Sequence, residues 1–259
     1  MKFSVIIPNY NGEEYINKCI DSVLNQTYKD FILIIVNDMS DDNSFELIKE
    51  YKDERIVLAE NKTKKFNGGT RNVGIDYAKM FKTDYTLFLD NDDWFIDDTC
   101  LYEIARIIET NNYPDCISLS YDCLIGKNES YQPQIRNTPK ELVESLYVAC
   151  WTKCIKTDLI EYFPENTLME DVVQHIKQVD KIENVVSCEK PIVCWNRNNV
   201  NSCSRVENQD CQNGKWQSSM YRYAADLMDL KCEKDYCEEH RKWRLEVVLN
   251  NIKDGKYIQ

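Results

Sequence analysis

The sequence predicts an α/β fold in which helices cover both faces of a mainly parallel sheet and a helical extension follows at the C-terminus. Short apolar runs alternate with helical patterns through the first half of the 259 residues, as parallel strands joined by helical crossovers require. Hydrophobic residues make up 43% of the chain and aromatic residues 11%. That apolar content offsets the entropy of ordering a large domain, so a disordered chain is excluded.

Four runs of β-favouring residues in the first half are expected to form central strands. The second run, FILIIV, is continuously apolar, as in strands that helices cover on both faces. The first run is expected to stop at Pro8, which has no N–H to donate. The expected strands are Phe3–Ile7, Phe31–Val36, Ile56–Ala59 and Tyr85–Leu89.

Helical periodicity fills the intervals between these strands. The first helix is expected from about Glu13 to Asn25, the second after a cap at Asp41 or Asp42, and the fourth after a cap at Asp97 or Asp98. The residues expected on the buried faces of the four helices are, in order, Ile16, Ile20, Val23 and Leu24; Phe45, Ile48 and Tyr51; Val73, Tyr77, Met80 and Phe81; and Leu101, Ile104, Ala105 and Ile108.

The second half is less regular and shows no repeat or flexible linker. Thr138–Glu141 reads TPKE, a capping box with proline at the first helical position, which marks the start of a helix. The other expected elements are a strand at Cys116–Tyr121, a helix from about Glu170, strands near Val185–Cys188 and Ile192–Arg197, and a charged helical tail over about 210–250. One compact unit with two halves accounts for this order.

Composition excludes several classes of function. The net charge of −12 argues against a nucleic-acid binder and against a broad basic face for an anionic membrane. No apolar run is long enough for a signal peptide or a membrane span, and seven glycines form neither GxGxxG nor GxxxxGK. Two histidines make a Ser-His-Asp site improbable, and twelve cysteines without a CxxC pair are expected to be reduced core residues of a cytosolic protein.

Polar clusters follow three of the expected strands, where an open α/β sheet binds its ligands. They are Pro8–Asn11, Asn37–Asp42 and the acidic turn Asp90-Asn91-Asp92-Asp93. Two carboxylates separated by one residue suit a hard divalent cation that keeps positions open for phosphate oxygens. The alternative for such a pair is an acidic surface loop that caps the next helix.

Taken together, the motifs resemble family 2 glycosyltransferases of the A-type fold. They are, in order, VIIPNYN, IIVNDMSDD, NGGTRNVGID, FLDNDDW, MEDV and CWNRNNVNS, between residue 3 and about residue 203. The resemblance implies a Rossmann-like sheet and an inverting transferase that uses a nucleotide-diphosphate sugar together with Mn²⁺ or Mg²⁺.

The resemblance also implies a role for each cluster. Asp92 would bind the metal, with Asp90 at the ribose or a metal-bound water, and the metal would neutralise the departing diphosphate. Asp38 would accept a hydrogen bond from the imide of uracil, and Arg71 would reach the nucleoside or the diphosphate. The remaining expected donor contacts are Pro8, Tyr10 and Asn11 around the base and Arg197 at the diphosphate.

The general base implied by the resemblance is Asp171, which would deprotonate the acceptor hydroxyl. Glu170 would position the acceptor or support a residue that touches the substrates, and the same kind of role is expected of Asp93. Acidic residues in a first helical turn also have an ordinary explanation, because the helix dipole favours them there. Trp94 and Trp151 are candidate sugar-stacking surfaces, and core packing is the alternative for both.

Two positions depart from the family pattern Asp-Asp-Gly-Ser after the second strand. Asn37 replaces the first aspartate and Met39 replaces glycine. Because Met39 restricts a backbone position that glycine leaves free, the loop on the base side is expected to take a different conformation.

The hypothesis is therefore an inverting transferase that moves a hexose or N-acetylhexosamine, favouring a UDP-sugar, to a glycan or lipid-linked acceptor. Residues 1–97 would form the nucleotide-binding half, 98–205 the acceptor-binding half and 206–259 the helical extension. A cytoplasmic protein is expected, with peripheral membrane association left open. The alternatives are a non-catalytic nucleotide-sugar-binding module and a sugar-phosphate nucleotidyltransferase. The donor sugar, the acceptor and linkage, the oligomeric state and the role of the tail stay open.

Overall fold

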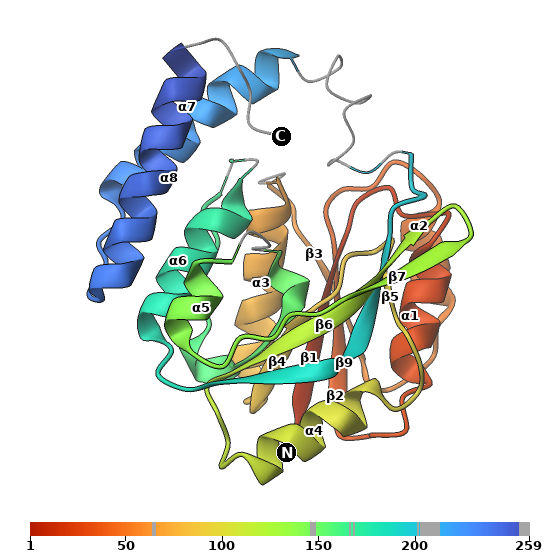
Figure 1. Ribbon diagram of the computed structural model, residues 1–259. Coiled ribbons are helices and arrows are strands. Elements are labelled where there is room, and N and C mark those ends of the chain that lie inside the picture. The colour runs from red at the N-terminus through yellow and green to blue at the C-terminus, as the bar shows by residue number, and fades with distance from the viewer. Residues whose placement is uncertain are drawn as a thin grey trace.

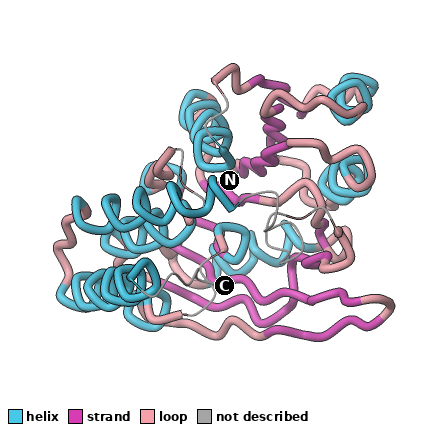
Figure 2. Tube along the Cα trace, turned by 90° about the horizontal axis from the view of Figure 1, so that it is seen from above, coloured by secondary structure: helices cyan, strands magenta, loops and turns pink. Residues whose placement is uncertain are grey.

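The computed structural model describes residues 1–63, 66–145, 149–165, 167, 169–200, 202 and 213–253, with the side chains of 66 and 213–220 left out. Helices cover both sides of a nine-stranded sheet, with α3 and α6 on one side and α1 on the other (Figure 1). The view from above shows the strands as a layer between helices (Figure 2). This arrangement confirms the α/β fold that the sequence predicts.

The first four strands form the parallel half of the sheet, in the order β3-β2-β1-β4. Their bounds are β1 (Phe3–Asn9), β2 (Phe31–Asn37), β3 (Ile56–Glu60) and β4 (Tyr85–Phe88). Every residue of β1 and β2 is buried. Helices on both faces account for that burial and for the continuous apolar runs in the sequence.

Pro8 does not end β1, contrary to the expectation from the sequence. The strand continues to Asn9, whose carbonyl accepts a hydrogen bond from Asp38 N at 2.8 Å on the β2 side. Successive residues of a strand alternate in direction, so the Pro8 nitrogen faces the β4 side. There the paired residues end at Ile6 and Phe88, and Leu89 N still donates to Ile6 O at 3.0 Å, so Pro8 lies beyond these hydrogen bonds and interrupts none of them.

Four helices connect or follow these strands: α1 (Ile16–Leu24), α2 (Ser44–Glu50), α3 (Phe66–Met80) and α4 (Cys100–Thr110). The expected buried face of α4 is confirmed, and so are Ile16, Ile20 and Val23 of α1. Phe45 of α2 and Tyr51 after it are only partly buried, which leaves Ile48 as the buried apolar residue of that expected face.

The buried face of α3 differs from the expected one. Met80 is 61% exposed and Phe81 38% exposed, whereas Arg71, Ile75 and Ala78 are buried. The reason is Gly74, because a Cβ atom there would lie 2.4 Å from Ile6 Cγ2 of β1. The glycine lets the helix pack directly on the strand, and this contact turns Arg71 inward.

The second half adds strands that pair mostly antiparallel, although β6 and β9 are parallel. The bounds are β5 (Trp94–Phe95), β6 (Cys116–Ile125), β7 (Asn128–Gln132), β8 (Lys153–Lys156) and β9 (Val185–Asn196). The two strands expected near 185–188 and 192–197 are one strand, β9, interrupted by register shifts where it pairs with β6. A bulge bends a strand without ending it, which explains the polar break in the sequence.

The remaining helices are α5 (Pro139–Val143), α6 (Glu170–Lys181), α7 (Asn213–Asp229) and α8 (Asp235–Lys253). The capping box at α5 is confirmed, since Thr138 Oγ1 accepts from Glu141 N at 3.2 Å while the Glu141 carboxylate accepts from Thr138 N at 3.1 Å. Helices α7 and α8 pack on each other and on α6, beside the sheet (Figure 1).

The described cysteines are free thiols, and all but Cys232 are buried, as expected for core residues. Cys203 and Cys211 lie outside the described residues. In the described part of the chain, no helix is both long and apolar enough to cross a membrane.

Met39 adopts the backbone conformation that glycine favours. Its φ is +57°, in the left-handed region, and its side chain is 48% exposed. Methionine therefore carries the steric cost of a conformation that glycine adopts without strain, and a different conformation of the loop from the family pattern stays a prediction.

Met39→Gly should raise the free energy of unfolding by about 0.5–1 kcal/mol, because glycine takes a positive φ without strain. The greater freedom of glycine in the unfolded chain offsets part of this gain in stability. Urea denaturation at equilibrium measures the change. Met80→Gly is the matched control, since Met80 is also an exposed methionine but is helical, and this variant should lose stability. A loss of stability in both variants would contradict the strain at Met39.

Candidate active site

The three polar clusters that follow β1, β2 and β4 lie at one edge of the sheet, as predicted. Parallel pairing of β1 with both neighbours sets the carboxyl ends of the three strands side by side. Asn9 and Asn37 are directly paired, and Asp90 follows β4 after Leu89, whose N–H donates to Ile6 O at 3.0 Å. Residues far apart in the sequence therefore meet in one polar region.

Arg71 connects this edge to the start of α6. Its guanidinium donates to Asp90 Oδ1 at 2.8 Å, to Glu170 Oε1 at 2.7 Å and to Asp171 Oδ1 at 3.3 Å. The side chain is only 2% exposed. Burial alone would lower the pKa of Arg71, but Cys150 and the three carboxylates raise it above its ordinary value. Arg71 thus stays charged and joins the acidic turn to the helix that carries the expected general base.

The two acidic residues of α6 differ in access to solvent. The side chain of Glu170 is 8% exposed, whereas that of Asp171 is 28% exposed. Burial and the neighbouring Asp171 raise the pKa of Glu170 to about 8, although Arg71 acts against them. Burial also raises the pKa of Asp171, again against the effect of Arg71. Asp171 is therefore the carboxylate that an incoming molecule can reach, and its raised pKa makes it a better proton acceptor.

The acidic turn holds two further carboxylates in different environments. Asp92 Oδ2 accepts from Asn199 Nδ2 at 2.7 Å, and burial together with Asp90 raises the pKa of Asp92 to about 6. Asp93 is 1% exposed and its Oδ1 accepts from Asn196 N at 2.8 Å. Asp93 therefore anchors the turn to the end of β9, and its burial keeps it from a direct contact with an acceptor.

The donor chemistry of the turn fits a divalent cation. Asp90 and Asp92 offer hard oxygen ligands. Burial is the main cause of the raised pKa of Asp92, and the negative charge of Asp90, which a bound cation would offset, adds to it. In the described ranges, no three His, Cys, Asp or Glu side chains gather into a complete metal site. Such a pair suits Mg²⁺ or Mn²⁺ that takes its remaining ligands from phosphate and water.

The side of the edge expected to hold a base combines exposed and buried groups. Tyr10 is 44% exposed, so its ring is accessible for stacking. Pro8 and Asp38 are buried, and Asp38 Oδ1 accepts from Asn61 Nδ2 at 2.9 Å. Asn11 exchanges hydrogen bonds with Asp41 and so braces the first loop against the second.

The expected aromatic and arginine contacts are distributed differently. Trp151 is 5% exposed and packs at 4.8 Å from the ring of Tyr121, which makes it a core residue here. Trp94 is partly exposed, with Lys18 Nζ 3.1 Å from its ring centroid. Arg197 is exposed and lies over Trp195 at 4.9 Å. Arg197 is thus accessible to an anion, whereas Trp151 is not accessible to a sugar.

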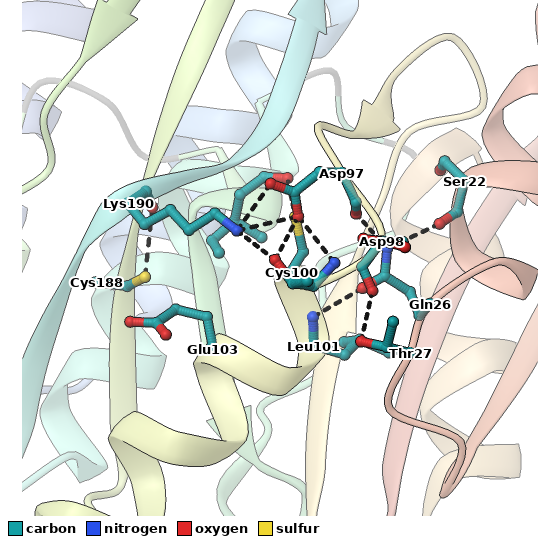
Figure 3. Close-up of polar contacts among 12 residues, drawn as sticks. Ser22, Gln26, Thr27, Asp97, Asp98, Cys100, Leu101, Glu103, Cys188 and Lys190 are labelled. Carbon is teal, nitrogen blue, oxygen red and sulfur yellow. Dashed lines mark hydrogen bonds and ion pairs between the residues drawn. The ribbon is translucent and has the colours of Figure 1, made fainter.

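Polar contacts from two other elements anchor the segment that follows the acidic turn (Figure 3). Gln26, just after α1, is fully buried, donates to Asp97 O at 2.6 Å and accepts from Leu101 N at 2.9 Å. Lys190 of β9 binds the Asp97 carboxylate at 2.8 Å. These contacts fix the start of α4, and with it the position of the acidic turn.

Sequence reasoning missed several asparagine and glutamine residues of the site. They are Asn61 beside Asp38, Asn91 within the acidic turn, Asn199 beside Asp92 and Gln26 below the turn. A side-chain amide has no charge and no characteristic spacing, so no sequence signal marks it. Asn91, inside the acidic motif, and Asn199, inside CWNRNNVNS, stood within quoted motifs, but neither received a role.

Comparison with known proteins decides the family. The sequence profile described as Glycosyl transferase family 2 matches residues 4–181, which is more than half of the chain. The chain belongs to glycosyl transferase family 2. The matched range spans the expected donor-side residues from Pro8 to the acidic turn and ends just after the general-base candidate Asp171.

Relatives of this family 2 protein include named transferases. Glycosyltransferase GlyA of Streptococcus pneumoniae serotype 4 is 28% identical over 277 residues, which cover 96% of this chain and 38% of GlyA. The UDP-Glc:alpha-D-GlcNAc-diphosphoundecaprenol beta-1,3-glucosyltransferase WfgD of Escherichia coli is 30% identical over 163 residues, 62% of either chain. The chain thus spans less than two thirds of the length of either relative.

Solved structures show the same fold. The S. aureus TarS fragment 1–349 in complex with UDP-GlcNAc has a TM-score of 0.72 and 22% identity, covering 99% of this chain and 74% of that fragment. The mannosyltransferase PcManGT from Pyrobaculum calidifontis, in complex with GDP-Man and Mn²⁺, has a TM-score of 0.61 and 12% identity, covering 96% and 73%. The A-type glycosyltransferase fold expected from the sequence is confirmed.

Without divalent cations at pH 7.5, Asp92→Asn should raise the free energy of unfolding by roughly 1–2 kcal/mol. The rise in the pKa of Asp92 to about 6 corresponds to about 3 kcal/mol, and screening by solvent reduces that value. The unfolded carboxyl ionises near its ordinary pKa of 3.8, whereas the folded one must be deprotonated against a pKa of about 6. The gain should therefore grow as the pH rises from about 4 to 6 and then level off. Urea denaturation at several pH values measures it.

Asp98→Asn is the control, because Asp98 is exposed and its side chain should contribute less than about 0.5 kcal/mol. A stability gain for Asp92→Asn that does not depend on pH would contradict the charge explanation. The same would follow from a loss of stability at pH 7.5.

Proposed function

We propose that the chain is the catalytic domain of an inverting glycosyltransferase that moves a hexose or N-acetylhexosamine from a UDP-sugar to a hydroxyl of a glycan or lipid-linked saccharide. One observation carries the proposal: Arg71 bridges Asp90 of the acidic turn and Asp171 at the start of α6. The residues expected at the donor and the residue expected to act as base therefore belong to one site. The exposure of Asp171 supports its role as that base.

Support for a UDP-sugar comes from the base side of the site and from the relatives. A buried carboxylate at Asp38 would accept the N3–H of uracil, and the exposed ring of Tyr10 would stack on the base. WfgD is named for UDP-Glc as its donor, and TarS was solved with UDP-GlcNAc. A glucosyl or N-acetylglucosaminyl donor is the proposal most consistent with both.

The reaction would be a single displacement. The acceptor oxygen attacks the anomeric carbon and forms the new glycosidic bond while the bond from that carbon to the β-phosphate oxygen breaks. Asp171 takes the proton of the acceptor hydroxyl, and the nucleotide diphosphate leaves with the bonding electron pair. Attack on the face opposite the leaving group inverts the configuration at the anomeric carbon. Arg71 holds Asp171 in place and contributes positive charge at the donor site.

Asp92, with Asp90, would hold the Mn²⁺ or Mg²⁺, which when bound supplies positive charge for the diphosphate. Arg197 would add a second cation from the exposed end of β9, where its guanidinium is accessible to phosphate. Glu170 would position Arg71 through its 2.7 Å contact without touching the substrate. Trp94 would contribute to the acceptor side, where it is partly exposed.

The two halves of the fold would bind different substrates. Residues 1–97 carry the proposed donor contacts except Arg197. Residues 98–205 carry Asp171 and Arg197 and would bind the acceptor, and 206–259 would be a helical extension. WfgD is named for a lipid-linked acceptor. TarP of Staphylococcus aureus, 36% identical over 168 residues that cover 62% of this chain and 44% of TarP, is named a poly(ribitol-phosphate) beta-N-acetylglucosaminyltransferase. By analogy, the proposed acceptor is a saccharide carried on a lipid or polymer, met from the cytoplasmic side of a membrane.

Asp171→Asn should lower transfer by at least about 10³-fold, because asparagine cannot accept the acceptor proton. Binding of UDP in the presence of Mn²⁺ should stay within about two-fold of wild type, since the donor contacts are elsewhere. Release of UDP from a panel of UDP-sugars measures turnover, and the thermal shift with UDP and Mn²⁺ measures binding.

Asp235→Asn is the matched control, because Asp235 is also an aspartate in the first turn of a helix but lies on α8. Its activity should equal that of wild type. Transfer at the wild-type rate by Asp171→Asn would contradict the assigned base. UDP binding by wild type without any UDP release from UDP-sugars would instead indicate a non-catalytic binding module.

A further inference from the structure

A chain of side-chain amides connects the base side of the proposed donor site to the acidic turn. Asn91 Nδ2 donates to Asn9 Oδ1 at 3.0 Å, and Asn9 Nδ2 donates to Asn37 Oδ1 at 3.2 Å. The three residues are called the amide chain below. Asn37 stands where the family pattern has aspartate, and Asn91 lies between Asp90 and Asp92. The amide chain therefore links the β1, β2 and β4 ends.

Asn9 is the central member of the amide chain. It is fully buried, and its amide nitrogen also lies within hydrogen-bond distance of Ser40 Oγ at 3.2 Å and Ser44 Oγ at 3.0 Å. Ser40 Oγ in turn donates to Asn37 Oδ1 at 2.7 Å. A buried amide with this many partners has one favourable orientation, because any rotation leaves a polar atom unsatisfied.

Gly12 makes room for the contact between Asn9 and Asn91. A Cβ atom at position 12 would lie 2.3 Å from Asn91 Nδ2 and 2.6 Å from Asn9 Oδ1. Any larger residue would therefore have to push the two amides apart. Gly12 thus offers a way to break the hydrogen bond without removing either amide.

We propose that the amide chain couples binding of the nucleoside to binding of the divalent cation, with Asn91 as the positioning residue. The inference rests on the proposed function, because it takes Asp38 and Tyr10 as nucleoside contacts and Asp90 and Asp92 as cation ligands. Asn37 is directly before Asp38, Asn9 is directly before Tyr10, and Asn91 is flanked by both aspartates. Each member of the chain thus adjoins a residue that one ligand would touch.

The physical basis is shared ordering of the loops. A nucleoside that fixes Tyr10 and Asp38 also fixes Asn9 and Asn37, and through Asn91 it restricts the acidic turn. The cation then meets carboxylates whose freedom is already reduced, so it binds with a smaller loss of entropy. The coupling is reciprocal, and a single set of hydrogen bonds between two sites is expected to give about five-fold or more.

The test measures Mn²⁺ binding to the whole chain from the electron paramagnetic resonance signal of free Mn²⁺, with and without saturating uridine. Uridine has no phosphate, so it cannot bridge to the ion and any effect must pass through the protein. Wild type should bind Mn²⁺ about five-fold more tightly with uridine. In Asn91→Ala and in Gly12→Ala, the gain in Mn²⁺ affinity from uridine should fall below about two-fold. The Mn²⁺ affinity without uridine should change less than the affinity with uridine.

Asn17→Ala is the control, since Asn17 is an exposed asparagine on α1, and it should keep the full coupling. Equal Mn²⁺ affinity with and without uridine in wild type, or full coupling in both Asn91→Ala and Gly12→Ala, would overturn the inference. UDP binding by wild type in the presence of Mn²⁺ is measured alongside. If UDP does not bind, the proposed function itself fails; if UDP binds while the coupling is absent, only the amide chain's role is wrong.

Discussion

The ion pairs of Arg71 are the interaction on which the rest of the site depends. One nearly inaccessible guanidinium contacts carboxylates from the acidic turn and from α6, which are 81 residues apart between Asp90 and Asp171. Without that positive charge, three carboxylates would lie together in a partly buried region, at a large cost in desolvation and repulsion. Arg71 thus makes it feasible to place donor-side and acceptor-side acids in one active site.

The fold supplies the constraint that puts Arg71 there. Gly74 allows α3 to lie directly on Ile6 of β1, and the face of α3 that carries Arg71 turns inward as a result. On the other side of the sheet, Gln26 and Lys190 fix the segment after the acidic turn. The side chains of Gln26 and Lys190 thus hold the segment after the acidic turn, and the Arg71 guanidinium holds Asp90. Together these contacts limit the freedom of the turn before any ligand binds.

Much of this could be predicted from the sequence, for physical reasons that also explain the failures. Continuous apolar runs identified the strands and helical periodicity most helices, although the N-caps of α2 and α4 are Asn43 and Thr99 and not the expected aspartates. The rule for open sheets placed Asp38, Asp90 and Asp92 at one edge. The buried face of α3 was not predictable from periodicity, since a small residue, Gly74, decides it. Asn61 was missed because a neutral side chain leaves no pattern in the sequence, and Asn199 lay inside a quoted motif that did not reveal its partner Asp92, 107 residues away.

The role of Arg71 is tested most directly by titrating the two carboxylates of α6, Glu170 and Asp171, in metal-free protein. Their ¹³C carboxyl resonances report the titration. Arg71 lowers the pKa of both groups. In Arg71→Met the titration of the pair should therefore move to higher pH by about one unit or more, whereas Arg71→Lys, which keeps a positive charge, should move it less. An unchanged or lower midpoint in Arg71→Met would contradict the central role of Arg71.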